Sequence, residues 1–557
     1  MTPLQRFFSL LKLDKKDVYQ IFFYATFAGL ISLSLPLGIQ AIINFIQSGR
    51  VSASWIVLII GVVVGVAFVG ILALMQLRIT ENLQQKIFVR SSFEFAYRLP
   101  KIRFEERYNE VYPPELANRF FDTLTIQKGI SKLLLDFSSA LLQIGFGIIL
   151  LSLYHPFFIL FGLLLVALLY LIFKFSYKPG LETSMKESKF KYGVATWLQE
   201  IARNHSSFRK NLNFDYALQK NNGLVEGYLA YREKHFNVIK RQFSQLIIFK
   251  IIITAGLLFI GGYLVISQKM NIGQFVASEI IILLVINSVE KIIIGLETFY
   301  DVLTSVEKIG QVTDMDMEDW GPDQKDSCFS TIILEAENIR FKFPDSKNDV
   351  LKNISLKISQ GEKIAITGKN GSGKTTLIRI LSGTLIPGNG SLSINDDTFR
   401  KINLAEYRSQ IGCFIQGETP FEGSILENIT FNNPEISQSD LKWVLDAVHL
   451  SPYIKTLPEG LDTMIFPDGR QLTSSNAQKI LLARCLISRP RILFLEDPTD
   501  KMDEAAAHAI IDFICDPKNR WTVVVSSPSA YWQEKANRHI IMEKGRIIND
   551  TNRYTNA

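Results

Sequence analysis

The apolar positions of this 557-residue chain are concentrated before about residue 305. Six stretches of about 20 mostly apolar residues lie there, and this is the length that an α-helix needs to cross a bilayer. Short links join them in pairs. Two long polar stretches, 78–132 and 177–245, separate the pairs and are rich in Lys, Arg and Glu but poor in Gly, which predicts helices that continue beyond the bilayer. The predicted membrane segments are Val18–Ile46, Trp55–Leu77, Leu133–Leu153, Phe157–Phe175, Leu246–Ile266 and Phe275–Leu296.

The basic residues predict how these segments are oriented. The short links Gln47–Ser54, His155–Pro156 and Gln268–Ile272 hold few positive charges, whereas the long polar stretches hold many. Because basic loops stay on the cytoplasmic side, the long stretches and both termini are expected there. The net charge of +6 is explained by these loops and requires no nucleic-acid partner. We therefore expect a multi-pass protein of the cell (inner) membrane, in contact with the lipid bilayer.

Four ionisable residues fall in or near the fifth and sixth segments. We expect Glu290 and Lys291 to be hydrated, because the sixth segment leaves the bilayer early, and Lys250 to extend its ammonium group toward the membrane surface. For Glu279 two interpretations remain open. It either lines the interior of the helix bundle or lies near the surface, and an ionisable group at membrane depth often marks a substrate or ion path.

Past residue 305 the composition becomes that of a soluble α/β domain. Residues 314–326 are acidic and polar, which predicts a linker, and alternation typical of a strand begins at Thr331. We therefore expect a membrane domain at 1–308, a linker at 309–330 and a second domain at 331–557. The predicted fold is a helical membrane domain of six helices with long cytosolic extensions, followed by an α/β domain.

The second domain contains a phosphate-binding loop. Residues 368–375 read Gly-Lys-Asn-Gly-Ser-Gly-Lys-Thr, which fits G-x-x-x-x-G-K-[ST], and they lie between a short apolar strand and a run with helical apolar spacing. Backbone N–H groups of such a loop bind phosphate, the lysine reaches the β- and γ-phosphates, and the threonine hydroxyl ligates Mg²⁺. The expected ATP- and Mg²⁺-binding residues are Gly368, Asn370, Gly371, Ser372, Gly373, Lys374, Thr375 and Thr376.

This organisation resembles the ABC transporters, in the form of exporter-type half transporters. Two segments add to the resemblance: Phe104-Glu105-Glu106-Arg107 is similar to the first cytosolic loop of the branch that exports peptides and proteins, as in type I secretion, and Asn271–Ala277 is similar to the start of its sixth helix. The resemblance implies an ABC nucleotide-binding domain at 331–557. It also implies a dimer, two ATP molecules sandwiched between the subunits, and alternating access of a central cavity.

The resemblance also implies roles for four further residues. Gln416 takes the position of the glutamine that senses Mg²⁺ and the attacking water, and Phe343 that of the aromatic residue that stacks on adenine. Glu496 takes the metal-binding position. Asp497 takes the position of the general base, where the family has a glutamate that is one methylene longer.

The γ-phosphate side of the expected site departs from the family pattern. Where the family has Leu-Ser-Gly-Gly-Gln, this chain has Leu472 followed by Thr473, Ser474, Ser475 and Asn476. The family's Asp-Glu pair is reversed. Pro528, or Ser527 if the alignment shifts by one residue, replaces the switch histidine, and neither side chain supplies an imidazole. The intact phosphate loop predicts that ATP binding is kept, and these departures predict that hydrolysis is slowed or lost.

Two hypotheses about function follow. The first is an ATP-driven exporter of a peptide, protein or lipid-like substrate, and the second is an ATP-binding membrane scaffold or regulator, with secretion or envelope proteins as partners. The expected partner within the transporter is a second half transporter. A homodimer is favoured over a heterodimer, although pairing with an intact partner would divide the defects between two composite sites. No sequence feature identifies a substrate.

Overall fold

The computed structural model describes all residues except 48–52, 105–111, 211–214, 319–330, 345, 396, 400–401 and 553–557. The chain forms two compact units: Met1–Ile102 with Val111–Met317, and Arg103–Glu110 with Glu318–Ala557. The last helix of the first unit ends at Thr313, so this unit continues past the boundary expected at residue 308. Most of the expected linker lies outside the described residues.

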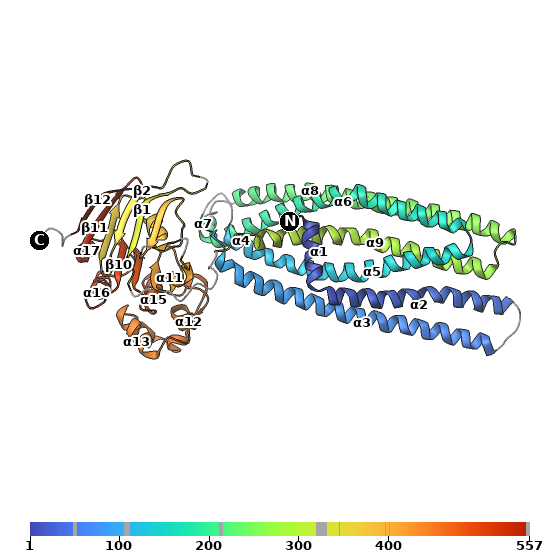
Figure 1. Cartoon of the computed structure of the whole chain (residues 1–557), viewed down its shortest axis with the longest axis horizontal. Coiled ribbons are helices and arrows are strands. Elements are labelled where there is room, and N and C mark those ends of the chain that lie inside the picture. The colour runs from blue at the N-terminus through green and yellow to red at the C-terminus, as the bar shows by residue number, and fades with distance from the viewer. Residues whose placement is uncertain are drawn as a thin grey trace. The chain divides into compact units, whose positions relative to one another are not determined.

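The first unit consists of long helices that pack in three pairs. Figure 1 shows α2 beside α3, α5 beside α9, and α6 beside α8. The helices run far beyond the length needed to cross a bilayer, which confirms the prediction of long helical extensions. The long helices are α2 (Lys15–Gln47), α3 (Ala53–Arg98), α5 (Asp122–Tyr154), α6 (Phe157–Arg203), α8 (Asp215–Ile266) and α9 (Ile272–Thr313). The short ones are α1 (Pro3–Leu13), η1 (Leu99–Lys101), α4 (Pro113–Asn118), η3 (Arg119–Phe121) and α7 (His205–Lys210).

Five helical segments of the described chain are long and apolar enough to cross a membrane: Lys15–Gln47, Ala53–Lys101, Pro113–Tyr154, Phe157–Arg203 and Asp215–Ile266. Helix α9, which contains the sixth predicted segment, is not among them. Helix α9 buries more side chains than any other described helix of this unit, so it forms the centre of the helical packing. The prediction that the membrane unit is built from long helices is confirmed.

The two ionisable residues Lys250 and Glu290 lie opposite each other, on α8 and α9. The Lys250 ammonium is 2.5 Å from a Glu290 carboxylate oxygen, and both side chains are partly buried. Lys250 therefore forms an ion pair between two helices, a partner that the sequence did not predict, and whether its ammonium group also reaches toward the membrane surface stays a prediction. Glu279 is half-buried and Lys291 is exposed.

The second unit contains a six-stranded sheet and a four-stranded antiparallel sheet. The six-stranded sheet has the order β12-β11-β3-β10-β9-β6, and all its neighbouring strands are parallel except the edge strand β12. Strands β3, β9 and β10 are almost continuously apolar because helices cover both faces of such a sheet. The strands are β1 (Leu334–Phe341), β2 (Leu351–Ile358), β3 (Lys363–Gly368), β4 (Asn389–Ile394), β5 (Asp397–Thr398), β6 (Ile411–Phe414), β7 (Gly423–Ser424), β8 (Met464–Ile465), β9 (Ile492–Glu496), β10 (Thr522–Ser526), β11 (Arg538–Glu543) and β12 (Arg546–Asn552).

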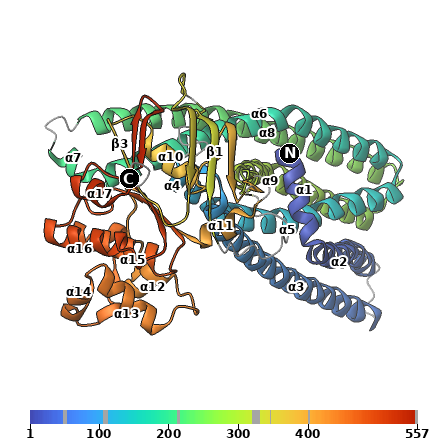
Figure 2. The same cartoon turned by 60° about the vertical axis from the view of Figure 1, so that its left-hand side comes forward.

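Helices α12 to α15 form a lobe of their own within this unit (Figure 2). An apolar core of buried side chains joins this lobe to strands β6, β9 and β10, so the N-terminus of α15 has a fixed position relative to the carboxyl ends of those strands. The helices of the unit are α10 (Lys374–Leu381), α11 (Leu404–Ser409), α12 (Ile425–Thr430), α13 (Gln438–Ala447), α14 (Ser451–Thr456), η4 (Gly460–Asp462), η5 (Pro467–Gly469), α15 (Ser474–Leu486), α16 (Glu504–Cys515) and α17 (Ala530–Lys535).

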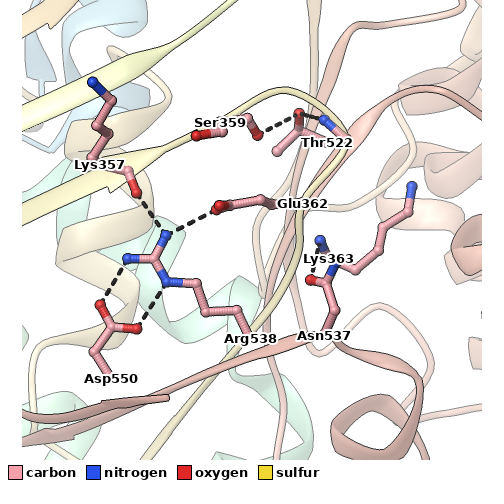
Figure 3. Close-up of polar contacts among 9 residues, drawn as sticks. Lys357, Ser359, Glu362, Lys363, Thr522, Asn537, Arg538 and Asp550 are labelled. Carbon is pink, nitrogen blue, oxygen red and sulfur yellow. Dashed lines mark hydrogen bonds and ion pairs between the residues drawn. The ribbon is translucent and has the colours of Figure 1, made fainter. Parts of the chain in front are cut away.

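Arg538 fixes the start of strand β3, which leads into the phosphate loop (Figure 3). Its guanidinium forms two hydrogen bonds with Asp550, at 2.8 and 2.7 Å, and a third with Glu362 at 2.9 Å. It also donates to the carbonyl of Lys357 at 2.7 Å. These bonds and the two carboxylates raise the pKa of the guanidinium above its usual value. One side chain therefore joins strands β2, β11 and β12 to the turn before β3.

Replacing Arg538 by methionine is expected to destabilise the second unit by about 2 kcal/mol, because Glu362 and Asp550 are left as partly buried carboxylates without their partner. Thermal unfolding of the full-length protein, followed by a fluorescent nucleotide bound to the loop, measures the change. The matched control is Arg546→Met, since Arg546 is an exposed arginine on the same hairpin. An equal loss of stability in both variants would contradict the role assigned to Arg538.

Candidate functional site

The phosphate loop lies between β3 and α10, as predicted, and two of its glycines are required by its conformation. Gly368 has φ of +150°, and a Cβ atom there would lie 2.2 Å from the carbonyl oxygen of Met542. Gly373 precedes α10 with φ of +98°, in the left-handed region that favours glycine. The backbone therefore turns tightly before the helix begins, and the first N–H groups of α10 face the loop.

Lys374 is held over this loop by two backbone carbonyls. Its ammonium group donates to the oxygen of Gly368 at 2.8 Å and to that of Lys369 at 3.2 Å. An ammonium group has three donors, so one remains to bind a phosphate oxygen. The loop geometry thus places a positive charge beside the N-terminus of α10, and both attract an anion.

The other expected loop residues divide into exposed and buried positions. Asn370 and Gly371 are exposed, whereas Ser372 and Thr376 are buried. The Ser372 hydroxyl lies inside the loop and has no hydrogen-bond partner among the described residues. Its backbone carbonyl accepts from the N–H of Gly545 at 3.1 Å, so Ser372 anchors the loop to the end of β11.

Oxygen ligands suited to Mg²⁺ meet at the carboxyl ends of the strands. The Thr375 hydroxyl forms a short hydrogen bond with one oxygen of Glu496, and the other oxygen accepts from the backbone N–H of Gln416 at 3.3 Å. Glu496 is almost fully buried. A hydroxyl and one carboxylate are what protein usually offers Mg²⁺, which takes its other ligands from water and phosphate oxygens. The donor set therefore fits Mg²⁺, with Thr375 and Glu496 holding it; the Gln416 side chain is exposed beside them.

Asp497 adopts a strained backbone conformation beside this position. It has φ of +46°, and its N–H donates to the carbonyl of Ser526 at 2.9 Å. One carboxylate oxygen is buried and has no hydrogen-bond partner in the described part of the chain. Burial raises the pKa of Asp497, and the Ser527 hydroxyl partly offsets this rise. Burial therefore makes Asp497 a stronger base, although its arm is shorter than that of a glutamate.

The two candidates for the switch position lie differently. Ser527 is buried next to Asp497, whereas Pro528 is exposed. The side chain that approaches the Asp497 carboxylate is therefore a hydroxyl, which forms a hydrogen bond but carries no charge.

The signature-like residues Thr473, Ser474 and Ser475 open helix α15. Thr473 is its N-cap, and its hydroxyl accepts from the N–H of Asn476 at 3.2 Å. Ser474 is exposed and Ser475 is half-buried. The two serines place side chains where the family pattern has glycines, at the end of the helix where free N–H groups attract an anion.

Phe343 follows strand β1 and is half-buried. Its ring meets that of Phe341 edge to face, with centroids 5.0 Å apart. This contact fixes the orientation of Phe343 and leaves part of the ring exposed for stacking.

Sequence reasoning missed one residue that joins these parts, Gln478. It is buried on α15, and its amide nitrogen donates to the carbonyl of Asp497 at 3.1 Å and to the Asp500 carboxylate. Its amide oxygen accepts from the N–H of Lys501 at 3.1 Å. The helix that begins at Thr473 is thereby bonded to the loop that carries the catalytic carboxylate. The only signal in the sequence was a polar residue among the apolar positions of α15.

Replacing Gln478 by leucine is expected to leave ATP affinity within about twofold and to slow phosphate release by about 10²-fold, since small displacements of a catalytic group have effects of this size. Single-turnover phosphate release and equilibrium nucleotide binding measure the two effects. Lys479→Leu, on the same helix, is the control. Loss of ATP binding in Gln478→Leu would show that this residue supports folding and has no specific effect on Asp497.

The arrangement defines a phosphate-loop nucleotide-binding domain, in a chain whose other unit is built from membrane-length helices. Two family profiles match this chain: "ABC transporter" over residues 351–500 and "ABC transporter transmembrane region" over residues 18–289. The chain belongs to the ABC transporter family, as the sequence resemblance predicted.

Relatives of known name support this assignment. The chain is 32% identical over 304 residues to the alpha-hemolysin translocation ATP-binding protein HlyB of Escherichia coli O157:H7, which covers 53% of this chain and 41% of that protein. It is 27% identical over 326 residues to the cyclolysin secretion/processing ATP-binding protein CyaB of Bordetella pertussis, covering 58% and 45%. The alignments thus cover less than half the length of these relatives.

One solved structure is similar over nearly the whole chain. A bacterial Atm1-family ABC exporter with ATP bound superimposes with a TM-score of 0.83, covering 97% of this chain and 96% of that one. At 16% identity this similarity concerns the fold, and it confirms the prediction of an exporter-type membrane domain followed by an α/β nucleotide-binding domain.

Proposed function

We propose that this chain is a half transporter that dimerises, binds Mg²⁺-ATP and couples the nucleotide to alternating access, with slow hydrolysis. The observation that supports ATP binding most directly is the meeting of Thr375 and Glu496 beside the loop that holds Lys374. The nucleotide-binding residues are those expected from the sequence, with Phe343 stacking on adenine, Gln416 sensing Mg²⁺ and Asp497 acting as general base.

Slow hydrolysis is inferred from the γ-phosphate side of the site. Ser474 and Ser475 replace residues without side chains, and Asp497 has the shorter arm. Loss of a positioned general base typically slows a reaction about 10²–10⁴-fold. The loop and the metal ligands retain the groups that bind the nucleotide. We therefore expect ATP to bind with ordinary affinity and to be hydrolysed slowly.

The arrangement of two subunits determines how these defects combine. Each composite site takes the phosphate loop from one subunit and Thr473–Ser475 from the other. In a homodimer both sites combine the short base with the serine-containing signature. We favour the homodimer, in the inner membrane with the nucleotide-binding domain in the cytoplasm.

The proposed substrate class is a peptide, a protein or a lipid-like amphiphile. HlyB is named for translocation of alpha-hemolysin, and CyaB for secretion and processing of cyclolysin. Because the matched regions cover less than half of these relatives, the transported substrate is inferred only at the level of its class.

A second function is supported by the same departures. If the composite sites close on ATP without cleaving it, the chain acts as an ATP-binding scaffold or regulator within a secretion or envelope complex. Ser474 and Ser475 favour this alternative, because their side chains stand where the family pattern has glycines that allow close backbone approach to the γ-phosphate.

One experiment separates the two functions. The purified full-length protein in lipid nanodiscs is assayed for ATP affinity, oligomeric state and multi-turnover phosphate release. Dimerisation and tight ATP binding with slow, substrate-stimulated release supports the exporter. Tight binding with no release, and ATP-dependent association with another membrane protein, supports the scaffold. Failure to bind ATP would refute both.

A further inference from the structure

The helix pair α6–α8 meets the pair α5–α9 across a polar seam in the part of the helices that extends beyond the predicted membrane segments. Ser184 and Thr304 share a hydrogen bond of 2.8 Å, and Gln242 donates to the Tyr300 hydroxyl at 3.0 Å. The Tyr192 hydroxyl donates to Asp122 at 2.5 Å. We call this boundary the polar seam, defined by Asp122, Ser184, Tyr192, Gln242, Tyr300 and Thr304.

Packing within the pair α5–α9 is different, because small residues there let large apolar side chains approach closely. Gly129 and Gly147 on α5 face Val302 and Val285 on α9 with no room for a Cβ atom. Such apolar packing is close and hard to open, whereas hydrogen-bonded polar surfaces exchange readily with water. The polar seam also contains one such close contact, since a Cβ atom on Gly180 of α6 would lie 2.5 Å from the Tyr300 ring, but its hydrogen bonds can be replaced by water when the two helix pairs separate.

A pocket of about 200 Å³ lies at this seam, and every residue that lines it is polar or charged. The four helices contribute Thr125 from α5, Ser184, Glu187, Ser188 and Lys191 from α6, Arg232 from α8, and Asp301, Thr304 and Ser305 from α9. By its size and polar lining the pocket can hold several water molecules, and two of its lining residues, Thr125 and Lys191, are exposed.

Asp301 is the one lining carboxylate for which no hydrogen bond or ion pair is found among the described residues. Arg232, the nearest candidate partner, is shared between Glu187 at 3.6 Å and Glu297 at 3.4 Å, and Lys191 lies 3.8 Å from Asp122. The charged groups that act on Asp301 are Glu297 on α9, Glu187 and Lys191 on α6, and Arg232 on α8. Beyond them, His235 lies near Arg232 and Glu187, and Asp122 lies near Lys191, Tyr192 and Lys308, with Arg119 and Glu115 near Lys308. Three carboxylates, Asp301 included, thus face two cationic side chains.

We propose that this pocket is a proton-binding site, with Asp301 as the acceptor, and that the bound proton closes the polar seam. Ionised Asp301 is a half-buried negative charge without an ion-pair partner in the described part of the chain, close to Glu187 and Glu297, and one proton removes that charge. Taking such a charge further out of water is unfavourable, so neutralisation favours the packed state of the two helix pairs. The proposal rests on the alternating access proposed above, since separation of the pairs is the motion it controls.

The direction of the pH dependence follows from the same groups. Burial, together with Glu297 and Glu187, raises the pKa of Asp301 from 3.8 to about 6 while the seam is closed. An open, hydrated seam returns this pKa toward its ordinary value, so closing is favoured as pH falls through 6. The ratio of closed to open protein therefore rises by at most about 100-fold, since each pKa unit of difference is worth a factor of ten. Burial raises the pKa of Tyr192, so its hydroxyl keeps its proton near pH 6, and burial lowers the pKa of His235.

Disulfide formation across the seam tests the proposal in the full-length protein, in nanodiscs without nucleotide and with the native cysteines replaced. Ser184→Cys with Thr304→Cys reports closure. Gly129→Cys with Val302→Cys is the matched control, because the Gly129 Cβ would lie 3.8 Å from that of Val302, which suits a disulfide within the α5–α9 pair. Dividing the first rate by the second removes the intrinsic pH dependence of the thiols.

The rate ratio is expected to rise at least about tenfold between about pH 7.5 and about pH 5. Asp301→Asn is expected to keep the ratio high at both pH values, and Glu182→Gln, which changes an exposed carboxylate on α6, to leave it unchanged. Asp122→Asn tests whether Asp122, the other acid at the seam, causes the pH dependence instead of Asp301. The pH dependence is expected to persist in that variant.

Three results would overturn the proposal: a ratio independent of pH, a pH dependence that survives in Asp301→Asn, or one that is lost only in Asp122→Asn. A ratio that follows Na⁺ or K⁺ at constant pH would assign the pocket to a metal cation and would overturn it as well. The control pair shows whether Asp301→Asn still folds. The crosslinking experiment contains no nucleotide. Its result can therefore be interpreted even if the proposed ATP-driven transport proves wrong.

Discussion

Replacing Lys374 with alanine is expected to weaken ATP binding about 10- to 100-fold. The substitution removes a positive charge that two backbone carbonyls hold over the phosphate loop. A charge-assisted hydrogen bond contributes about 1.5–3 kcal/mol, and a factor of ten in affinity is about 1.4 kcal/mol. Equilibrium titration of the full-length protein with a fluorescent ATP analogue measures the loss.

Lys369→Ala is the matched control for this prediction. Lys369 lies in the same loop and its side chain is exposed, while its backbone carbonyl continues to accept from Lys374. We expect its effect on affinity to stay within about threefold, the size of a single screened surface charge. Equal losses in both variants would show that binding depends on loop charge in general and would refute the specific role of Lys374.

The phosphate loop was predictable because its sequence determines a local structure. The glycines at 368 and 373 adopt backbone conformations that other residues rarely adopt, and the flanking strand and helix follow from apolar spacing alone. The long helices were predictable for the same reason, since each is a continuous run without helix-breaking clusters. The end of α9 at Thr313 was not, because the composition changes before the helix ends.

The pairings between distant residues could not be predicted. Lys250 and Glu290 are 40 positions apart, and whether they meet depends on the rotation of two helices about their axes. The same holds for Gln478 and Asp497, and for Asp301 and its neighbours in the polar seam. Periodicity shows which face of a helix is apolar, but it does not show which residue of another helix lies opposite.

Lengthening Asp497 to glutamate is expected to raise ATP turnover about 10²-fold when Ser474→Gly and Ser475→Gly are introduced with it. The glutamate restores the reach of the general base, worth about 10²–10⁴ in rate where the base is well positioned. The glycines remove two side chains from the helix end that we propose binds the γ-phosphate of the partner site. Multi-turnover phosphate release from the full-length protein measures the gain, and the triple variant is compared with each change alone.

The matched control is Asp397→Glu, which adds the same methylene to an exposed acid on β5 and should leave turnover unchanged. A wild-type protein that already turns over at the rate of the triple variant would contradict the inferred defect. A triple variant that stays inactive while ATP still binds would place the obstacle outside the catalytic carboxylate and the signature. The scaffold function would then be favoured. The groups that act on the γ-phosphate would have been restored, and the protein would still stop at the closed, ATP-bound state.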